Sequence, residues 1–210
     1  MRDRLWGGPR RGYHHGNLRE TLIEAARHLI AVNGPEGFSL IEAARLAEVS
    51  PAAPYRHFPD RNALVDAVAA RGFVLFGERL QAAAAGTRDA ATAFRRMGAA
   101  YLAFAREEPG YYAAMFEVRR SPGVAAGEGE SAFGLLAAAV RGIMPPGSFD
   151  AATIDAISVE IWALSHGIAM LTGSGGVLKR AGVPSAEDLL DSAVTALIEG
   201  HLVRRRERAG

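Results

Sequence analysis

Apolar residues recur along this chain with the 3.6-residue period of an amphipathic helix. The first such pattern runs from Leu18 to Val32 and is stopped by Asn33-Gly34-Pro35. No sustained alternation of β-branched residues marks a strand anywhere in the sequence. The pattern therefore predicts an all-α fold of about nine helices.

The second and third predicted helices are short and follow each other closely. Ser39 and Glu42 have the spacing of a capping box, which starts a helix whose apolar face is mostly alanine. Ser50 is the expected N-cap of the third helix, with Pro51 at its first position. This third helix should end at Pro59, because the residue before a proline avoids the α conformation.

The rest of the chain also has helical periodicity. Asp60 is expected to cap a long fourth helix that reaches at least Leu80. Later patterns predict helices near residues 88–106, 109–119, 130–143, 149–173 and 185–205, the last one starting at Ser185 and Asp188. Gly- and Pro-rich segments connect them.

The composition is that of a protein with a real hydrophobic core, with 49% hydrophobic and 22% charged residues. Its apolar runs are shorter than the roughly 20 residues that span a bilayer, and no signal segment is apparent, so we expect a cytoplasmic protein without a membrane partner. The chain has 0 cysteines, which excludes disulfides and thiolate zinc sites. The net charge of +1 hides two basic ends and decides nothing about nucleic acid.

The common catalytic motifs are missing. The sequence has no G-x-S-x-G elbow, no phosphate-binding G-x-x-x-x-G-K-[ST] loop and no H-E-x-x-H zinc motif, and GSGG at 173–176 follows no predicted strand. His166 has no acidic residue or histidine four positions later, so we expect no metal site. We expect no enzyme and no cofactor; a helical small-molecule-binding protein or enzyme without DNA function is the alternative.

The second and third helices, supported by the first, have the pattern of a helix-turn-helix unit. The segment FSLIEAARLAEVSPAAPYRHFPDRNALVDAV, residues 38–68, resembles the TetR/AcrR family of bacterial transcriptional regulators through Ser50, Tyr55 and Phe58, which form an S-x-x-x-x-Y-x-x-F element. The resemblance covers residues 18 to 76. It implies a basic arm at 1–16, a helix-turn-helix domain at 17–62, and a ligand-binding and dimerisation domain at 63–210.

The resemblance also implies which residues contact double-stranded operator DNA. Three small residues should lie nearest the bases, and polar and basic residues should hold phosphates. The candidates are Arg10, Arg11, Ser39, Arg45, Ser50, Pro51, Ala52, Ala53, Tyr55, Arg56, His57 and Arg61. The basic arm that holds the first two either enters the minor groove or is a solvated tail.

Glu48 departs from the family, which usually has Gly in the turn between the two short helices. A non-Gly residue at positive φ costs on the order of 1 kcal/mol. Either the turn differs here or the domain tolerates that cost.

The segment EIWALSHGIAML, with Trp162, His166 and Gly167, resembles the C-terminal domain of a TetR subgroup named for a Trp-His-Gly motif, mainly over residues 94–202. The resemblance implies a cavity for a small-molecule effector of unknown identity; as single residues, its candidates are also ordinary core residues. They are Phe94, Met97, Tyr101, Phe104, Tyr112, Met115, Phe116, Phe133, Trp162, His166 and Met170.

The helix predicted at 149–173 has two apolar faces, so both need a cover. One cover is the chain's own core and the other is a second copy of the chain, and the pattern leaves open which face is which. With the last helix it could form the homodimer interface typical of TetR-like repressors, which bind palindromic operators. The interface candidates are Ile157, Ile161, Leu164, Ile168, Leu189, Ala193, Ala196, Leu197 and Gly200.

Overall fold

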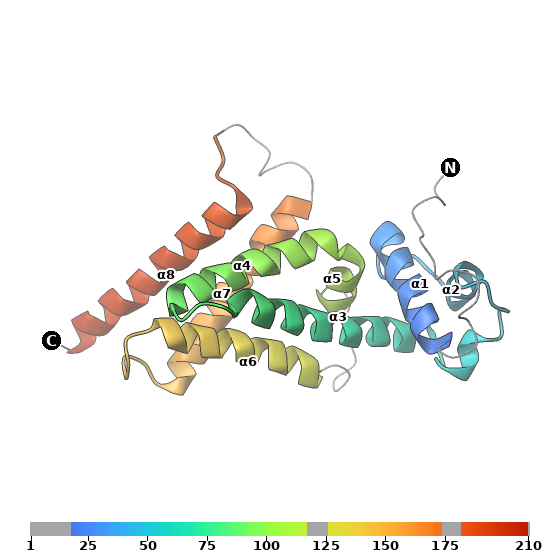
Figure 1. Ribbon diagram of the computed structural model, residues 1–210, viewed down its shortest axis with the longest axis horizontal. Helices are drawn as coiled ribbons and strands as arrows, with labels where there is room; N and C mark the ends of the chain where they lie inside the picture. Colours follow the sequence, from blue (N-terminus) through green and yellow to red (C-terminus); the bar gives the residue numbers. More distant parts are fainter. Residues whose placement is uncertain (1–17, 117–125, 174–181, 210) are drawn as a thin grey trace. The chain divides into compact units, whose positions relative to one another are not determined.

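The computed structural model describes residues 18–116, 126–173 and 182–209, which contain helices and no strand (Figure 1). The all-α prediction is confirmed. In chain order the elements are α1 (Leu18–Asn33), α2 (Leu40–Leu46), the 3-10 helix η2 (Pro54–Arg56), α3 (Arg61–Ala84), α4 (Ala90–Glu107), α5 (Pro109–Phe116), α6 (Ala126–Ile143), α7 (Ala151–Gly173) and α8 (Ala186–Ala209).

The chain divides into two compact units. The first contains the residues up to Leu75 together with Glu108–Glu128, and the second contains Phe76–Glu107 together with Gly129–Gly210. Helix α3 contributes residues to both units, because its range crosses the boundary at Leu75.

The first unit is built around α1, which buries one face against α2 and α5. Leu22 and Ala26 of α1 are fully buried, as the spacing predicted. Helix α5 approaches α1 very closely at Gly110, where a Cβ atom would lie 2.1 Å from the backbone oxygen of Arg27. Only glycine fits this contact without moving one of the two helices.

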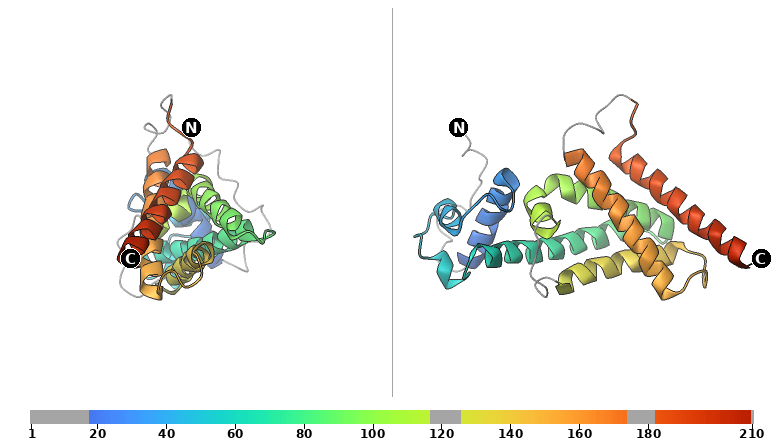
Figure 2. Two further views of the ribbon diagram at one scale, coloured as in Figure 1. Left: turned by 90° about the vertical axis from the view of Figure 1, so that its left-hand side faces the viewer. Right: turned by 180° about the vertical axis from the view of Figure 1, so that it is seen from behind.

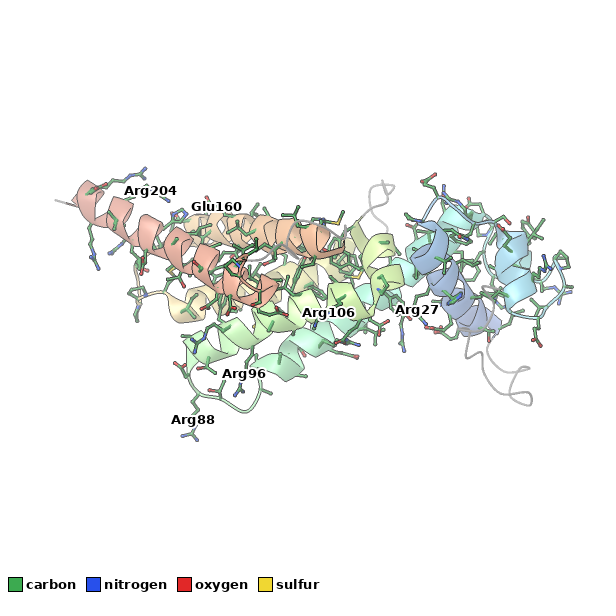
Figure 3. The ribbon with its side chains drawn as sticks, turned by 90° about the horizontal axis from the view of Figure 1, so that it is seen from above. Arg27, Arg88, Arg96, Arg106, Glu160 and Arg204 are labelled. Atoms are coloured by element: carbon green, nitrogen blue, oxygen red, sulfur yellow. The ribbon has the colours of Figure 1, made fainter. Side chains whose placement is uncertain are left out.

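The second unit packs α4, α6, α7 and α8 with the latter part of α3. Helices α7 and α8 lie side by side (Figures 1 and 2), and the ring of His201 on α8 lies 2.8 Å from a carboxylate oxygen of Glu160 on α7. Arg106 on α4 forms an ion pair of 3.4 Å with Glu187 on α8; Figure 3 labels Arg106 and Glu160. These polar contacts join helices that already share apolar surface.

Helix α7 turns one of its two apolar faces toward the core of its own unit. Ile157 and Ile161 are buried there, whereas Val159 and Met170 on the opposite face are 57% and 43% exposed. The structure thereby decides which face of α7 meets the chain's own core. Within the described part of the chain, residues 151–172 of α7 alone have the length and apolar composition of a membrane span, and 39% of the most apolar stretch is buried inside the protein.

Four predicted helix starts are present. The backbone N–H of Glu42 donates to the Ser39 hydroxyl at 3.2 Å, and the Glu42 carboxylate accepts from the Ser39 backbone N–H at 2.8 Å, which completes the capping box. Side chains of Asp60, Asp150 and Ser185 accept backbone N–H groups at 2.8, 2.8 and 3.0 Å at the starts of α3, α7 and α8.

The third predicted helix differs from the prediction. Residues 51–53 form a turn closed by the N–H of Ala53 on the Ser50 carbonyl at 2.9 Å, and only Pro54–Arg56 are helical, in the 3-10 form. Pro54 is the reason, because it has no N–H to continue an α-helix from Ser50. Pro54 instead starts the short helix, in the position that the sequence assigned to Pro51.

Among the described residues, Glu48 alone of the non-glycine residues has a positive φ, which is 57°. The turn between α2 and η2 therefore keeps the left-handed conformation that usually requires glycine. Of the two possibilities, the structure shows that the domain tolerates the cost.

Candidate DNA-binding surface and small-molecule cavity

The turn around η2 presents three consecutive polar side chains to solvent. Tyr55 is 56% exposed, and Arg56 and His57 are also exposed. The flanking residues Pro54 and Phe58 are buried in the first unit and hold the turn in place. Tyr55 is therefore a surface residue, and its phenol, the guanidinium and the imidazole can all donate hydrogen bonds to an anionic partner.

The other predicted DNA contacts in this unit have different surroundings. Ser50, Pro51, Ala52 and Arg45 are exposed, and Ala53 is half-buried. Ser39 is exposed, but its hydroxyl already forms the capping box of α2. Arg10 and Arg11 lie outside the described residues.

Arg61 is already engaged by its own unit. Its guanidinium donates to the carbonyl of Pro35 and lies 3.6 Å from the carboxylate of Glu36. It also lies over the ring of Phe38, 5.9 Å from the centroid. These contacts join the start of α3 to the loop before α2, which sequence spacing did not indicate.

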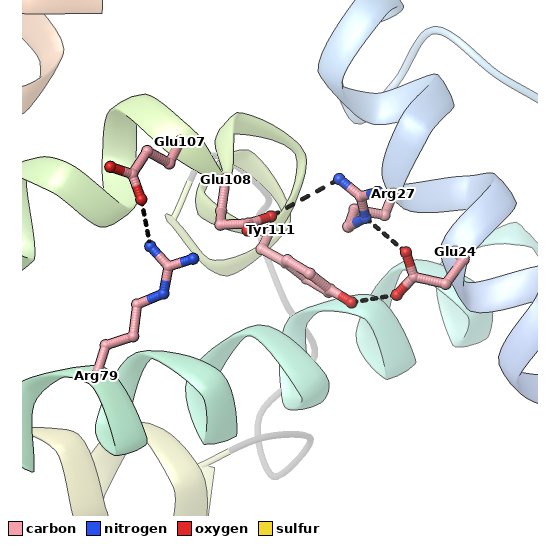
Figure 4. Close-up of polar contacts among 6 residues, drawn as sticks. All are labelled: Glu24, Arg27, Arg79, Glu107, Glu108 and Tyr111. Atoms are coloured by element: carbon pink, nitrogen blue, oxygen red, sulfur yellow. Dashed lines mark hydrogen bonds and ion pairs between the residues drawn. The ribbon is translucent and has the colours of Figure 1, made fainter. Parts of the chain in front are cut away.

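A polar cluster joins α1 to α5 in the same unit (Figure 4). The Tyr111 hydroxyl donates to Glu24 at 2.5 Å, and Arg27 donates to the other oxygen of Glu24 at 2.8 Å. Arg27 also lies 3.7 Å from Glu108. Burial raises the pKa of the Tyr111 hydroxyl, and its hydrogen bond to Glu24 raises that pKa further. Helix α5 is thus fixed to α1 by charge and by the close contact at Gly110.

The second unit contains a cavity of about 630 Å³ between α3, α4, α6, α7 and α8. Four residues predicted for a ligand pocket line it: Phe94, Met97, Tyr101 and Trp162. The sequence missed Phe76 of α3, whose ring packs edge-on to that of Tyr101 at 5.3 Å. A cavity of this size with mainly apolar walls can hold a small organic molecule.

Seven predicted pocket residues do not line this cavity. Phe104 is fully buried in the core, Phe133 stacks on Trp162 at 5.5 Å, and Met170 lies on the exposed face of α7. Three more predicted pocket residues lie on α5, which belongs to the first unit. They are Tyr112, Met115 and Phe116.

His166, the seventh, is not among the residues that line the cavity. Its Nδ1 is 3.2 Å from the hydroxyl of Tyr101, a contact that orients the phenol at the cavity. Within the described ranges no group of three His, Asp or Glu residues could hold a metal ion.

The predicted dimer residues lie in two kinds of place. Ile157, Ile161 and Ile168 on α7 are buried inside their own unit, and Ile161 also lines the cavity. They are buried because they form the more strongly apolar face of α7, and burying that face in the core removes the most apolar surface from water. On α8, Ala196 is exposed, and Leu189, Ala193, Leu197 and Gly200 are half-buried, as is Leu164 on α7.

Two sequence families match separate parts of the chain. The family described as bacterial regulatory proteins, tetR family, matches residues 22–68. The family described as Tetracyclin repressor-like, C-terminal domain, matches residues 94–197. Among curated proteins, no match was found.

Solved structures resemble the chain over nearly its whole length. A protein of unknown function from Rhodococcus sp. RHA1 is 32% identical, with a TM-score of 0.72, over 90% of this chain and 98% of that one. A TetR-like transcriptional regulator from the same organism is 19% identical, with a TM-score of 0.68, over 88% and 97%. A regulatory protein of the tetR family from Rhodococcus RHA1 is 17% identical, with a TM-score of 0.66, over 86% and 95%. The last two likenesses show the fold alone.

Proposed function

This chain belongs to the TetR family of bacterial regulatory proteins, a family of transcription regulators rather than enzymes, and we propose that it is a homodimeric repressor of a palindromic operator. TetR family regulators bind operator DNA and dimerise. The observation that carries the proposal is the turn in which Tyr55, Arg56 and His57 are exposed between buried Pro54 and Phe58.

At the DNA, the small residues Pro51, Ala52 and Ala53 lie nearest the base edges. Their lack of long side chains lets the backbone approach the major groove, and the alanine methyl groups can contact thymine methyl groups. Arg56 is the candidate for hydrogen bonds to bases. We assign Arg61 mainly to bracing its own unit, because its guanidinium is already hydrogen-bonded there.

Phosphate contacts are assigned to Tyr55, His57 and Arg45. The double variant Tyr55→Phe/His57→Ala should bind operator DNA more weakly and with a flatter dependence on salt, because phosphate contacts release counterions. Its thermal stability should change little, since both side chains are exposed. Fluorescence anisotropy with promoter DNA at several salt concentrations measures this; Arg88→Ala in the second unit is the control. Unchanged binding by the double variant would contradict the assignment.

For the dimer we propose the exposed stripe of α7 as the centre of the interface. Its residues recur every three or four positions on one side of the helix and are small or apolar. They are Ala152, Ala156, Val159, Ala163, Gly167 and Met170. The neighbouring flank of α8 adds Leu189, Ala193, Ala196 and Gly200. A twofold interface of this kind would hold two DNA-binding units about 34 Å apart, or a multiple of that distance.

Val159→Glu tests this interface. A buried carboxylate in each copy would destabilise the dimer, so the variant should elute as a monomer in size-exclusion chromatography with light scattering. Val74→Glu, at a valine of 44% exposure on α3, is the matched control and should leave the oligomeric state unchanged. A Val159→Glu variant that remains dimeric would refute the placement of the interface.

The cavity of the second unit is the proposed effector site. Phe76 and Leu80 of α3 line it, and α3 continues without a break to Arg61 beside the DNA-binding turn. A small apolar effector that fits the cavity in only one position of α3 would change the spacing of the two DNA-binding turns. It would shift the equilibrium only by its difference in affinity for the two states.

A further inference from the structure

The cavity of the second unit has walls of two different chemistries. Helices α3, α4 and α7 contribute aromatic rings, including Phe76, Phe94 and Trp162. Helix α8 contributes four carboxylates, those of Glu187, Asp188, Asp191 and Glu199. One guanidinium, that of Arg95 on α4, also lines the cavity. The carboxylates therefore dominate the charge of the wall.

Local structure accounts for two of these carboxylates. Glu187 pairs with Arg106, and Asp188 accepts a hydrogen bond from the hydroxyl of Ser185 at 2.6 Å. Both lie in the first turn of α8, where negative charge stabilises a helix. They need no ligand to explain them.

Asp191 and Glu199 have no such local partner. They lie beyond the first turn of α8, their side chains are exposed at the rim of the cavity, and within the described part of the chain neither has a hydrogen bond or ion pair. With Glu187 and Thr195 they follow a four-residue spacing, which places all of them along one side of α8 that lines the cavity. The flank proposed for the dimer is the other side of the helix, so the two roles do not compete.

Resting on the proposed role of the cavity as an effector site, we propose that its ligand is an amphipathic organic cation. The aromatic rings that line the cavity would receive its apolar body, and aromatic side chains also attract positive charge. The carboxylates of Asp191 and Glu199 lie exposed at the rim of an apolar cavity, where their negative charge attracts a cation and repels an anion, most strongly at low salt. An apolar carboxylic acid is disfavoured for the same reason.

Two ions of the same shape and opposite charge test this directly: tetraphenylphosphonium and tetraphenylborate. The chain has 2 tryptophans, so in a Trp6→Phe background quenching of Trp162 fluorescence reports on the cavity. The phosphonium should bind about tenfold or more tightly than the borate. Equal binding, or tighter binding of the borate, would overturn the proposal.

Substitutions identify the carboxylates responsible. Asp191→Asn/Glu199→Gln should weaken phosphonium binding about 3- to 10-fold without weakening borate binding. Asp155→Asn/Glu207→Gln removes the same charge from positions that do not line the cavity and should change neither affinity. An unchanged phosphonium affinity in the first variant would also overturn the proposal.

Release of operator DNA by the phosphonium is a separate measurement. If the cation binds selectively but leaves DNA binding unchanged, the effector response proposed above fails while the cation preference stands. If DNA is released equally by both ions, the cation preference fails while the effector response stands.

Discussion

The left-handed backbone at Glu48 can be tested with substitutions that separate strain from charge. At a φ of 57° the Cβ atom of any L-residue lies too close to the following carbonyl oxygen, which costs roughly 1–2 kcal/mol. Glu48→Ala keeps the Cβ atom and the strain, and Glu48→Gly removes both. Glycine loses roughly 0.5–1 kcal/mol more conformational entropy on folding, so the glycine variant should be more stable than the alanine variant by up to about 1.5 kcal/mol.

Thermal unfolding measures this difference. For a chain of this size about 1 kcal/mol corresponds to a Tm difference of roughly 2–4 °C. Glu48→Asn should fall between the other two variants, because asparagine tolerates the left-handed region better than alanine does. An alanine variant more stable than the glycine variant would refute the claim that this position is strained.

DNA binding separates the charge from the strain. Glu48 is exposed in the turn before the proposed DNA contacts, so its carboxylate should repel phosphates. Glu48→Ala and Glu48→Gly both remove this charge and should strengthen operator binding equally at low salt. A gain confined to the glycine variant would mean that backbone conformation, and not charge, limits binding.

Two further predictions concern packing and pH. Gly110→Ala should destabilise the protein by about 1–3 kcal/mol or more, because its Cβ atom would lie 2.1 Å from the backbone oxygen of Arg27. In α6 the site of Gly134 is open, so Gly134→Ala should raise stability by about 0.5–1 kcal/mol. Thermal unfolding measures both variants, and equal changes in their stability would contradict the packing argument. Hydrogen bonds from Thr153 lower the pKa of Asp150 below its ordinary 3.8, so its stabilising effect is present above that value and is lost as the pH falls through the lowered pKa. The Tm difference between the wild type and Asp150→Asn should therefore shrink in acid. A Tm difference that does not change with pH would contradict this prediction.

Local sequence determined where most helices start. The capping side chains of Ser39, Asp60, Asp150 and Ser185 accept hydrogen bonds from backbone N–H groups a few residues later in the sequence. Because both partners are close in sequence, the sequence alone predicts the interaction. A short element near Tyr55 was predicted for a similar reason, since its prolines and aromatic residues form a compact motif. Its 3-10 form was not predicted, because Ser50 and Pro51 favour an α-helix there, whereas Pro54 lacks the N–H that such a helix would need.

Only the tertiary structure decided which apolar helix faces pack against each other in the core and which remain exposed. Both faces of α7 are apolar, so periodicity could not tell that Ile157 belongs to the core and Val159 to the surface. Likewise, Tyr101 and His166 meet across 65 residues, and Glu24 and Tyr111 across 87. Such contacts depend on how helices pack in space, and a helical period specifies which residues share a face but not the partner of that face.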